Sequence, residues 1–337
     1  MESRYQRQAL FKEIGDHGQK KIRQKHIGIV GCGALGSQSA DMLSRAGIGK
    51  LTLIDRDYVE LTNLQRQQLY TEEDVEKQLP KAVACKNHLE KINHEVDVDA
   101  IVLDLTADNI TSSLKNVDLI IDATDNFDTR FLINDFAQKH KIPWIFGACV
   151  GSAGMSFTFI PDQTPCLDCL IKTAPMYGAT CDSVGIISPA VQMVVANQVS
   201  EALKWLVEAK EKMRSTFITF DLWQNTYYSM NVTKAKSEEC PSCGEQPVYP
   251  HLQFKNHPKS EILCGRNTVQ IRRQTANISL EELAKHVASF GKVTTNPFLV
   301  SVDMDPYRIV FFRDGRTFIH GTNSIDKAKS LYYKMIG

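Results

Sequence analysis

The feature that most constrains the fold of this chain is a short apolar strand that leads directly into a glycine-rich turn. Residues 26–30 read HIGIV, and Gly31, Gly33 and Gly36 follow in the spacing GxGxxG, with a helix expected over 34–46. A strand, such a turn and a helix in this order bring backbone N–H groups and a helix N-terminus against the phosphates of a nucleotide. The segment therefore predicts an α/β fold with a nucleotide site.

A second strand, expected over 50–54, ends at an acidic residue. Asp55 follows the glycines by about 20 residues, a distance at which a carboxylate can hold a ribose hydroxyl. Both features have a simpler interpretation, since glycine turns also serve close packing and an acid here can be a plain turn or cap residue. The next segment departs from a dehydrogenase, because it holds a dense polar cluster placed to meet a highly charged group: Asn63, Gln65, Arg66 and Gln67.

Strands and helices alternate through the first 150 residues. Further strands are expected over 96–103, 118–124 and 143–149, and further helices over 80–93 and 127–140. This alternation predicts a Rossmann-like, mostly parallel sheet covered on both faces. An antiparallel extension of the sheet is expected from residues 155–160, and an N-terminal helix from residues 1–25.

The chain after residue 160 predicts a loop and then a long helix. The loop covers 161–187, and Ser188 is expected as the N-cap of the helix, with Pro189 at its first position. Strands are expected over 217–222 and 226–233.

A change of composition places a domain boundary near residue 246. The stretch 234–250 is rich in Lys, Glu, Pro and Cys, and we assign residues 1–246 to one domain and 250–337 to a small α+β domain. In the second domain a capping box at 279–282 precedes a helix over 280–290. Strands over 300–304 and 307–312, an Asp-Gly hairpin turn at 314–315, a strand over 316–319 and a terminal helix complete it.

Composition excludes several classes of protein. The chain has 337 residues with 39 basic and 39 acidic side chains, and this balance argues against a surface that coats nucleic acid. The sequence contains no run of 18 apolar residues, so it predicts no membrane span. The first residues, MESRYQRQ, lack the apolar core of a signal peptide, so we expect a cytoplasmic protein.

The cysteines form two matching pairs. Cys166 and Cys169 have the spacing C-x-x-C, and so do Cys240 and Cys243. Each pair can hold one edge of a tetrahedral zinc ion, and four thiolates leave no open position for water, so we expect a structural zinc (Zn2+). Unrelated free thiols or a redox pair are the alternatives.

The motifs together resemble the MoeB/ThiF/HesA family, the bacterial relatives of ubiquitin-activating enzymes. The resemblance covers about residues 3–246. It rests on RYQRQ at 4–8, the glycine turn, DRDYVELTNLQRQ at 55–67, Lys81, ATDN at 123–126, TC at 180–181 and the two cysteine pairs.

This resemblance implies an adenylyltransferase. Such an enzyme binds Mg-ATP and the C-terminal Gly-Gly of a ubiquitin-like sulfur-carrier protein, whose carboxylate attacks the α-phosphate. The carrier serves molybdopterin or thiamine-thiazole synthesis, and of these we favour the molybdopterin-type carrier. A sulfurtransferase or a cysteine desulfurase is the expected partner that supplies sulfur.

The resemblance also assigns roles within the site. A carboxylate and a triphosphate repel each other, so positive charge must be aimed at the transition state, and Arg66 and Lys81 are the expected cations. Asn63 and Gln67 are expected to donate to phosphate, and Asp125 to bind magnesium (Mg2+). Asp57 and Asn126 complete the expected nucleotide site. Simpler interpretations are a solvated lysine for Lys81, a surface ion pair for Arg66, and a helix cap for residues 125–126.

Two further residues have roles that the resemblance implies. Arg7 corresponds to an arginine that reaches the nucleotide of the neighbouring subunit, which would make the enzyme a homodimer with shared sites. Cys181 matches the position of a nucleophilic cysteine in some relatives, although in others the adenylate itself is the product.

Other functions remain open from sequence alone. The glycines and Asp55 permit an NAD-dependent oxidoreductase, and a zinc-stabilised interaction protein with an inactive nucleotide site is a third hypothesis. Activation of a small carboxylate or a tRNA base is a related alternative. In the second domain Cys264 is the one suggestion of a rhodanese-like loop, and a buried cysteine is the better interpretation. Cys32, Cys85 and Cys149 are expected in the core.

Overall fold

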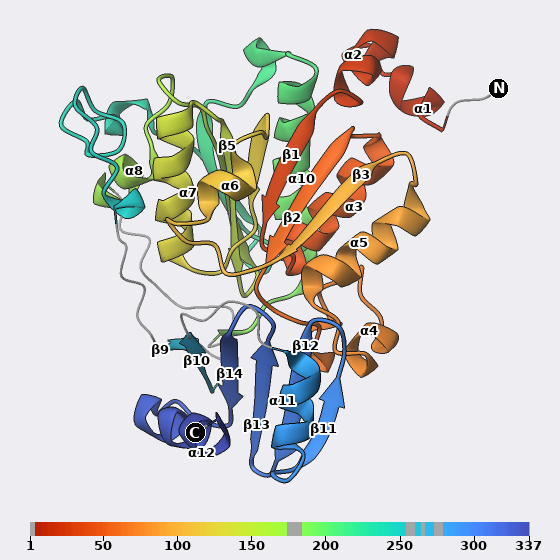
Figure 1. Ribbon diagram of the computed structural model, residues 1–337. Helices are drawn as coiled ribbons and strands as arrows, with labels where there is room; N and C mark the ends of the chain where they lie inside the picture. Colours follow the sequence, from red (N-terminus) through yellow and green to blue (C-terminus); the bar gives the residue numbers. More distant parts are fainter. Residues whose placement is uncertain (1–3, 174–183, 254–259, 264–266, 273–278, 337) are drawn as a thin grey trace. The chain divides into compact units, whose positions relative to one another are not determined.

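The computed structural model describes residues 4–173, 184–253, 260–263, 267–272 and 279–336 (Figure 1). The chain divides into two compact units. The first comprises 1–76, 80–179 and 185–255, and the second comprises 77–79, 180–184 and 256–337. Among the described residues, no helix combines the length and apolar composition that a membrane span requires.

An eight-stranded sheet forms the centre of the first unit. Its strands are β1 (His26–Val30), β2 (Lys50–Asp55), β3 (Asp97–Val102), β4 (Leu119–Asp122), β5 (Trp144–Val150), β6 (Ala153–Phe159), β7 (Thr216–Asp221) and β8 (Thr226–Asn231). They lie in the order β3-β2-β1-β4-β5-β6-β7-β8. The strands from β3 to β5 in this order pair in parallel, and β6, β7 and β8 add antiparallel. The predicted mostly parallel sheet with an antiparallel extension is confirmed.

Helices cover both faces of this sheet (Figure 1). One face carries α3 (Ala34–Ala46), α5 (Lys81–Ile92) and α10 (Ser188–Leu206), which also contact one another. The other face carries α6 (Ile110–Leu114), α7 (Phe127–His140) and α8 (Leu167–Thr173), whose apolar residues share one core cluster with Trp144 and Phe146 of β5. Strand residues alternate between the two faces of the sheet, so the central strands β1, β2, β4 and β5 are buried on both faces along most of their length.

The strand order reverses beside β1. The chain passes from β1 outwards to β2 and β3, and then returns to place β4 on the other side of β1. In open α/β sheets ligands bind at such a reversal, beyond the carboxyl ends of the strands. Here the loops that follow β1 and β4 meet at this point.

The second unit is a two-layer α+β structure. Its antiparallel sheet has the order β11-β12-β13-β14-β10-β9. The strands are β9 (Ser260–Leu263), β10 (Thr268–Arg272), β11 (Lys292–Thr295), β12 (Leu299–Met304), β13 (Tyr307–Phe312) and β14 (Arg316–His320). The helices α11 (Leu280–Val287) and α12 (Ile325–Ile336) contribute to an apolar core on one face of the sheet.

Two predictions of local structure in this unit are confirmed. Ser279 caps α11 by accepting a hydrogen bond from the backbone of Glu282, at 3.4 Å. Gly315 has φ 84° in the hairpin between β13 and β14, a conformation that favours glycine. Three of the strands, β9, β10 and β11, had no clear signal in the sequence because each is only four or five residues long.

Three expectations of local structure in the first unit are wrong. The predicted single helix over 1–25 is two helices in the described residues, α1 (Gln6–Ala9) and α2 (Gly15–Ile22), because residues 10–14 are not helical and Gly15 begins α2 with φ 57°. The N-cap of α10 is Ile187, and Ser188 instead accepts a hydrogen bond from the side chain of Gln68 at 3.1 Å. The expected loop 161–187 contains α8, a helix of seven residues that packs into the core.

The remaining short helices of the first unit lie at its surface. They are α4 (Glu72–Glu76) and the 3₁₀ turns η1 (Leu61–Asn63), η2 (Lys210–Lys212), η3 (Thr233–Ala235) and η4 (Pro250–Leu252).

Candidate nucleotide and metal sites

The glycine turn after β1 is shaped by close backbone contacts. Gly31 has φ 90°, and a Cβ atom there would lie 2.5 Å from the carbonyl oxygen of Ala123. A Cβ atom on Gly36 would lie 1.8 Å from the carbonyl oxygen of Gly31. Neither glycine can carry a side chain, and Gly33 is the N-cap of α3. The turn therefore touches the loop after β4 and presents the unpaired N–H groups of the first turn of α3, which suits an anionic ligand.

Asp55 ties this turn to the end of β2. Its Oδ2 accepts the backbone N–H of Cys32 at 2.6 Å, and its Oδ1 accepts that of Asp57 at 2.7 Å. Burial raises the pKa of Asp55, and the nearby charge of Lys81 opposes the rise. A carboxylate has about four acceptor positions, so capacity remains for the ribose hydroxyl that the sequence predicts at Asp55.

Lys81 and Asp57 form a buried ion pair beside the turn. The distance from Lys81 Nζ to Asp57 Oδ2 is 3.0 Å, and the two side chains are only 4% and 10% exposed. The backbone N–H of Lys81 also donates to the carbonyl of Asp57 at 2.8 Å. Tyr70 joins the pair to the glycine turn, because its hydroxyl contacts the carbonyl oxygens of Cys32 and Lys81. The simpler interpretation of Lys81 as a solvated lysine is wrong.

The polar cluster that follows β2 contains a buried side-chain amide whose oxygen can still accept a hydrogen bond. Gln67 is buried, its Nε2 lies 3.8 Å from a Cβ position built on Gly33, and its Oε1 is buried without a hydrogen-bond partner among the described residues. Asn63 closes η1 by accepting the N–H of Glu60 at 3.1 Å. The guanidinium of Arg66 donates to the carbonyl of Thr62 at 3.0 Å.

A surface ion pair does not explain Arg66. No described acidic side chain pairs with it, and its side chain is half-buried beside this cluster. A buried amide without a partner and an unneutralised guanidinium fit a phosphate-bearing ligand.

The loop from β4 to α7 places Asp125 at the same end of the sheet. Asp125 is exposed, and its Oδ1 accepts a hydrogen bond from the amide of Asn126 at 3.3 Å. Asn126 is also the N-cap of α7, since its side chain accepts the N–H of Thr129 at 2.9 Å. The interpretation of Asn126 as a helix cap is therefore confirmed, and the cap holds the residue next to Asp125 in place.

Arg130 was missed from the sequence and organises this loop. It is buried, and its guanidinium pairs with Asp122 at 3.1 Å and donates to the carbonyls of Thr124 at 2.7 Å and Gly147 at 3.2 Å. Burial raises the pKa of Asp122, and Arg130 opposes the rise. The available signal was a charge on the buried face of α7, one turn after its N-cap.

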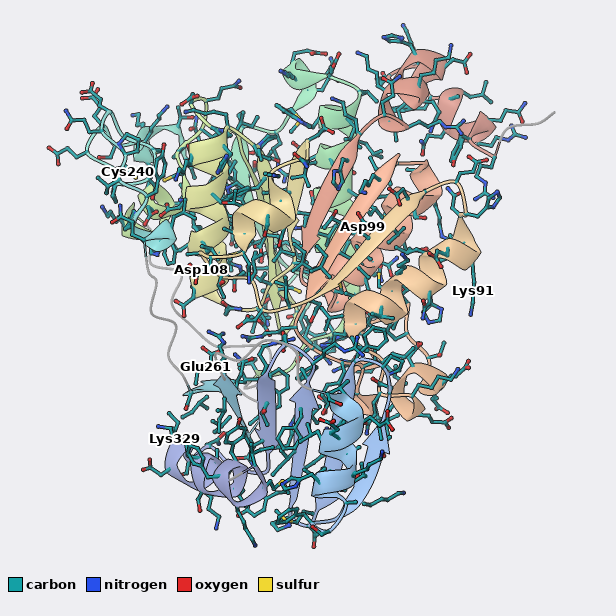
Figure 2. All side chains as sticks on the ribbon, viewed as in Figure 1. Lys91, Asp99, Asp108, Cys240, Glu261 and Lys329 are labelled. Carbon is teal, nitrogen blue, oxygen red and sulfur yellow. The ribbon has the colours of Figure 1, made fainter. Side chains whose placement is uncertain are left out.

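The four cysteines of the two pairs come together at the end of the unit that holds α7 and α8, where Figure 2 labels Cys240. Neighbouring sulfur atoms lie 3.9 Å apart for Cys166 and Cys169, 3.5 Å for Cys166 and Cys240, and 3.6 Å for Cys169 and Cys243. Zinc–sulfur bonds of about 2.3 Å in a tetrahedron require sulfur atoms about 3.8 Å apart. The donor set therefore fits zinc.

A buried polar network supports the cysteine cluster from the side of α7. The hydroxyl of Ser242 contacts the carboxylates of Asp135 at 2.5 Å and Asp168 at 2.6 Å. Burial raises the pKa of Asp135, whose Oδ2 accepts the backbone N–H of His251. The neighbouring Asp168 raises the pKa of His251, which stacks on Phe131. These groups hold α7, α8 and the segment after Cys240 together.

The remaining residues singled out from the sequence are exposed, buried or outside the described residues. Arg7 lies on α1 with its side chain exposed. Cys181 and Cys264 lie outside the described residues. Cys32, Cys85 and Cys149 are buried, as expected.

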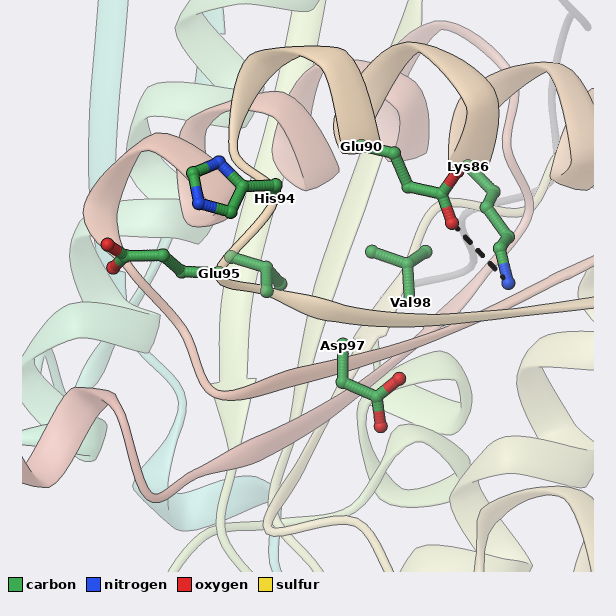
Figure 3. Close-up of a pocket in the computed structure, with 7 residues that line it drawn as sticks. Lys86, Glu90, His94, Glu95, Asp97 and Val98 are labelled. Carbon is green, nitrogen blue, oxygen red and sulfur yellow. Dashed lines mark ion pairs between the residues drawn. The ribbon is translucent and has the colours of Figure 1, made fainter.

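A surface hollow lies at the opposite end of the sheet. It is lined by the end of α5 and the start of β3, including Glu90, His94 and Asp97, and Lys86 pairs with Glu90 at 3.7 Å (Figure 3). Because β3 begins at Asp97, this hollow is at the amino end of the strand. Ligands of open α/β sheets bind at the carboxyl ends, so we do not assign the hollow to the nucleotide.

Fold and site together define a nucleotide-binding α/β protein, and comparison with known proteins gives its family. Residues 5–242 match the ThiF family. A sulfur carrier protein ThiS adenylyltransferase of Bacillus subtilis (strain 168) is 50% identical over 339 residues, which cover 100% of both chains. A sulfur carrier protein adenylyltransferase of Thermus thermophilus is 32% identical over 269 residues, 78% of this chain and 96% of that protein.

A solved structure agrees with the family. The crystal structure of E. coli MccB with AMPCPP and MccA has a TM-score of 0.62 and 25% identity, and covers 72% of this chain and 74% of that one. The chain belongs to the ThiF family of adenylyltransferases. The family identified from the motifs is confirmed.

Proposed function

We propose that this protein uses ATP to adenylate the C-terminal glycine of a ubiquitin-like sulfur carrier of the ThiS type. The observation that carries the proposal is that the glycine turn after β1, the buried Lys81 and the exposed Asp125 lie at the carboxyl end of the parallel strands. The 50% identity to a ThiS adenylyltransferase along the whole chain supports the choice of carrier. From sequence alone a molybdopterin-type carrier is favoured, but no comparison supports that preference over ThiS.

The proposed reaction is a displacement at phosphorus. A carboxylate oxygen of the carrier bonds to the α-phosphorus of ATP, the bond from this phosphorus to the bridging oxygen breaks, and pyrophosphate leaves. Both reactants are anions, so fixed cations must stabilise the charge that develops. We assign this role to Lys81 and Arg66, with Asn63 and Gln67 as neutral partners of phosphate. Gly31, Gly33 and Gly36 would hold the phosphates by their backbone, and Asp55 the ribose.

Two metals belong to the proposal. Asp125 would bind Mg2+, which when present neutralises phosphate charge, while Asp57 orients Lys81 and Asn126 orients Asp125. Cys166, Cys169, Cys240 and Cys243 would bind a structural Zn2+. Residues 1–246 form the adenylation domain in this proposal, and residues 250–337 a second domain. Cys181 as an acceptor thiol, and a sulfurtransferase or cysteine desulfurase as sulfur donor, remain proposals from the family resemblance.

Carrier-dependent ATP–pyrophosphate exchange tests the function. The purified protein is mixed with a ThiS-type or a MoaD-type carrier, each intact or lacking its Gly-Gly end. We expect exchange with the intact ThiS-type carrier and none with the truncated forms. No exchange with any carrier would redirect the assignment to a small carboxylate, an RNA base or a binding protein. Tight NADH binding, with no effect of ATP on the melting temperature, would instead favour an oxidoreductase.

The exposed carboxylate of Asp125 provides a sharper version of this test. We expect Asp125→Asn to abolish exchange and to leave the melting temperature unchanged, because an exposed side chain contributes little to stability. Asp128→Asn, three residues on and also exposed, is the matched control and should behave as wild type. Near-normal exchange by Asp125→Asn would remove its assigned role at the metal.

A further inference from the structure

A short piece of the second unit lies directly before Lys81 in the chain. Residues 77–79 belong to the second unit, although Glu76, the last residue of α4, and Pro80 both belong to the first. Lys81 is the first residue of α5 and follows this segment after one residue. Whatever holds residues 77–79 therefore acts on the start of α5 through the continuous chain.

One side chain of the second unit holds this segment. Asn296 lies in the turn between β11 and β12, which Figure 1 labels, and its Nδ2 donates to the carbonyl oxygens of Lys77 and Gln78, both at 3.0 Å. Its Oδ1 accepts the N–H groups of Phe298 at 2.9 Å and Leu299 at 3.0 Å. Because two donors occupy the oxygen, the nitrogen is the atom that faces the carbonyls, and the orientation of the amide follows from its partners.

The segment that Asn296 holds has an unfavourable backbone. Gln78 has φ 47°, a left-handed conformation that residues other than glycine rarely adopt without support from their surroundings. Pro80 then pairs with Tyr58 in an isolated bridge, and the N–H of Lys81 donates to Asp57. The chain from residue 77 to Lys81 is thus held at one end by the hydrogen bonds of Asn296 and at the other by the hydrogen bond from Lys81 to Asp57.

We propose that Asn296 is a positioning residue for Lys81, and that one role of the second unit is to set the start of α5 for adenylation. The proposal rests on the proposed function, in that Lys81 is taken to stabilise charge on the phosphates of ATP. Loss of the Asn296 amide would let residues 77–79 relax and would displace Lys81 from its place beside Asp57. A small displacement of a charge that acts in the transition state lowers kcat more than it raises KM.

Asn296→Asp tests this in the full-length protein. An aspartate keeps the oxygen that accepts from Phe298 and Leu299, but it has no N–H to donate to Lys77 and Gln78. We expect kcat for carrier-dependent ATP–pyrophosphate exchange to fall about tenfold, with KM for ATP and carrier nearly unchanged. Asn296→Ser, which carries no charge and can still accept from the turn, should act in the same direction. Asn323→Asp, an exposed change in the same unit, should have no effect.

Amide hydrogen exchange separates positioning from a general structural role. In Asn296→Asp the amide hydrogens of residues 78, 79, 81 and 82 should exchange faster, while those of β12 and β13 keep wild-type protection; Pro80 has no amide hydrogen. Wild-type kcat, wild-type protection of residues 78–82, or equal loss of protection in β12 and β13 for both variants would overturn the proposal. If the wild-type protein itself shows no carrier-dependent ATP–pyrophosphate exchange, the proposed function fails. Amide hydrogen exchange alone then decides whether Asn296 holds residues 77–79.

Discussion

Lys81 lies 24 residues after Asp57 in the chain, and the two side chains meet in a buried ion pair. Removing one partner of such a pair leaves a buried charge without compensation, which typically costs about 3–5 kcal/mol. A buried lysine beside this glycine turn is better explained by chemistry than by stability, since a pair of well-packed apolar residues often serves stability equally well.

At this scale we predict that Lys81→Met lowers carrier-dependent exchange by about 10²–10³-fold, the usual effect of losing one group that stabilises a transition state. It should also lower the free energy of unfolding, because the buried carboxylate of Asp57 then lacks the ammonium of Lys81. Lys86→Met, on the same helix and partly exposed, is the control for both measurements.

A double variant separates the two effects of Lys81. In Asp57→Asn with Lys81→Met the buried negative charge at residue 57 is removed as well, so stability should recover in urea unfolding while ATP–pyrophosphate exchange stays low. Recovery of exchange in the double variant would contradict a catalytic role for Lys81.

At the scale of the elements, the four cysteines of the candidate zinc site come from two separate segments of the chain. Cys166 and Cys169 lie at the start of α8, whereas Cys240 and Cys243 lie in the segment that follows β8 and η3. Gly244 closes this second pair, because a Cβ atom there would lie 2.3 Å from the carbonyl oxygen of Glu238. The cluster thus joins parts of the chain that are 74 residues apart, which is the arrangement in which a metal constrains a fold most.

We therefore predict that Cys240→Ser loses bound zinc and melts at a lower temperature. Zinc content by atomic absorption and a thermal scan are the measurements, and a chelator should lower the melting temperature of the wild-type protein in the same way. Cys149→Ser, a change at a buried cysteine of β5 away from the cluster, should keep its zinc. Unchanged zinc in Cys240→Ser would exclude a site made of all four cysteines.

At the scale of the whole molecule, the surface of the N-terminal segment bears on the homodimer that we propose. Tyr5 is buried and bonded to Asn93 and Glu95, which anchors α1, while Arg7 on the same helix is exposed. Leu10 and Phe11, which follow directly, are 69% and 57% exposed. Exposed apolar side chains next to an exposed arginine fit an interface with another copy of the chain, as the family resemblance implies.

We predict that Arg7→Ala and Asp125→Ala proteins, each inactive alone, regain activity when their subunits are exchanged. If Arg7 acts on the partner's site, one site in each mixed dimer has both residues. Since half of the dimers in an equal mixture are mixed, about a quarter of wild-type exchange should return. Native mass spectrometry, which separates the mixed dimer from the two parent dimers by its mass, verifies subunit exchange. No recovery under those conditions would place Arg7 in its own subunit's site or outside the site.

Local signals in the sequence were sufficient for most elements. The apolar run of β1 and the glycines after it predicted the strand, the turn and α3, because a backbone with no room for a Cβ atom accepts only glycine. The Asn cap of α7 and the Asp-Gly hairpin were equally direct. Signals failed where a tertiary contact decided the outcome, as in α8, which the core of the first unit stabilises, and in the short strands β9 to β11, which only the neighbouring strands define.

The sequence by itself determined the nucleotide turn, the alternation that gives a parallel sheet, the two cysteine pairs and the family, because each depends on residue types at fixed short spacings. Only the tertiary structure decided which of these residues are buried and which meet. The pairing of Lys81 with Asp57, the network of Arg130 with Asp122, and the contact of Asn296 with residues 77–78 join positions that no local spacing connects. Burial and charge pairing depend on how elements that are distant in the chain pack together, and short-range sequence patterns do not specify that packing.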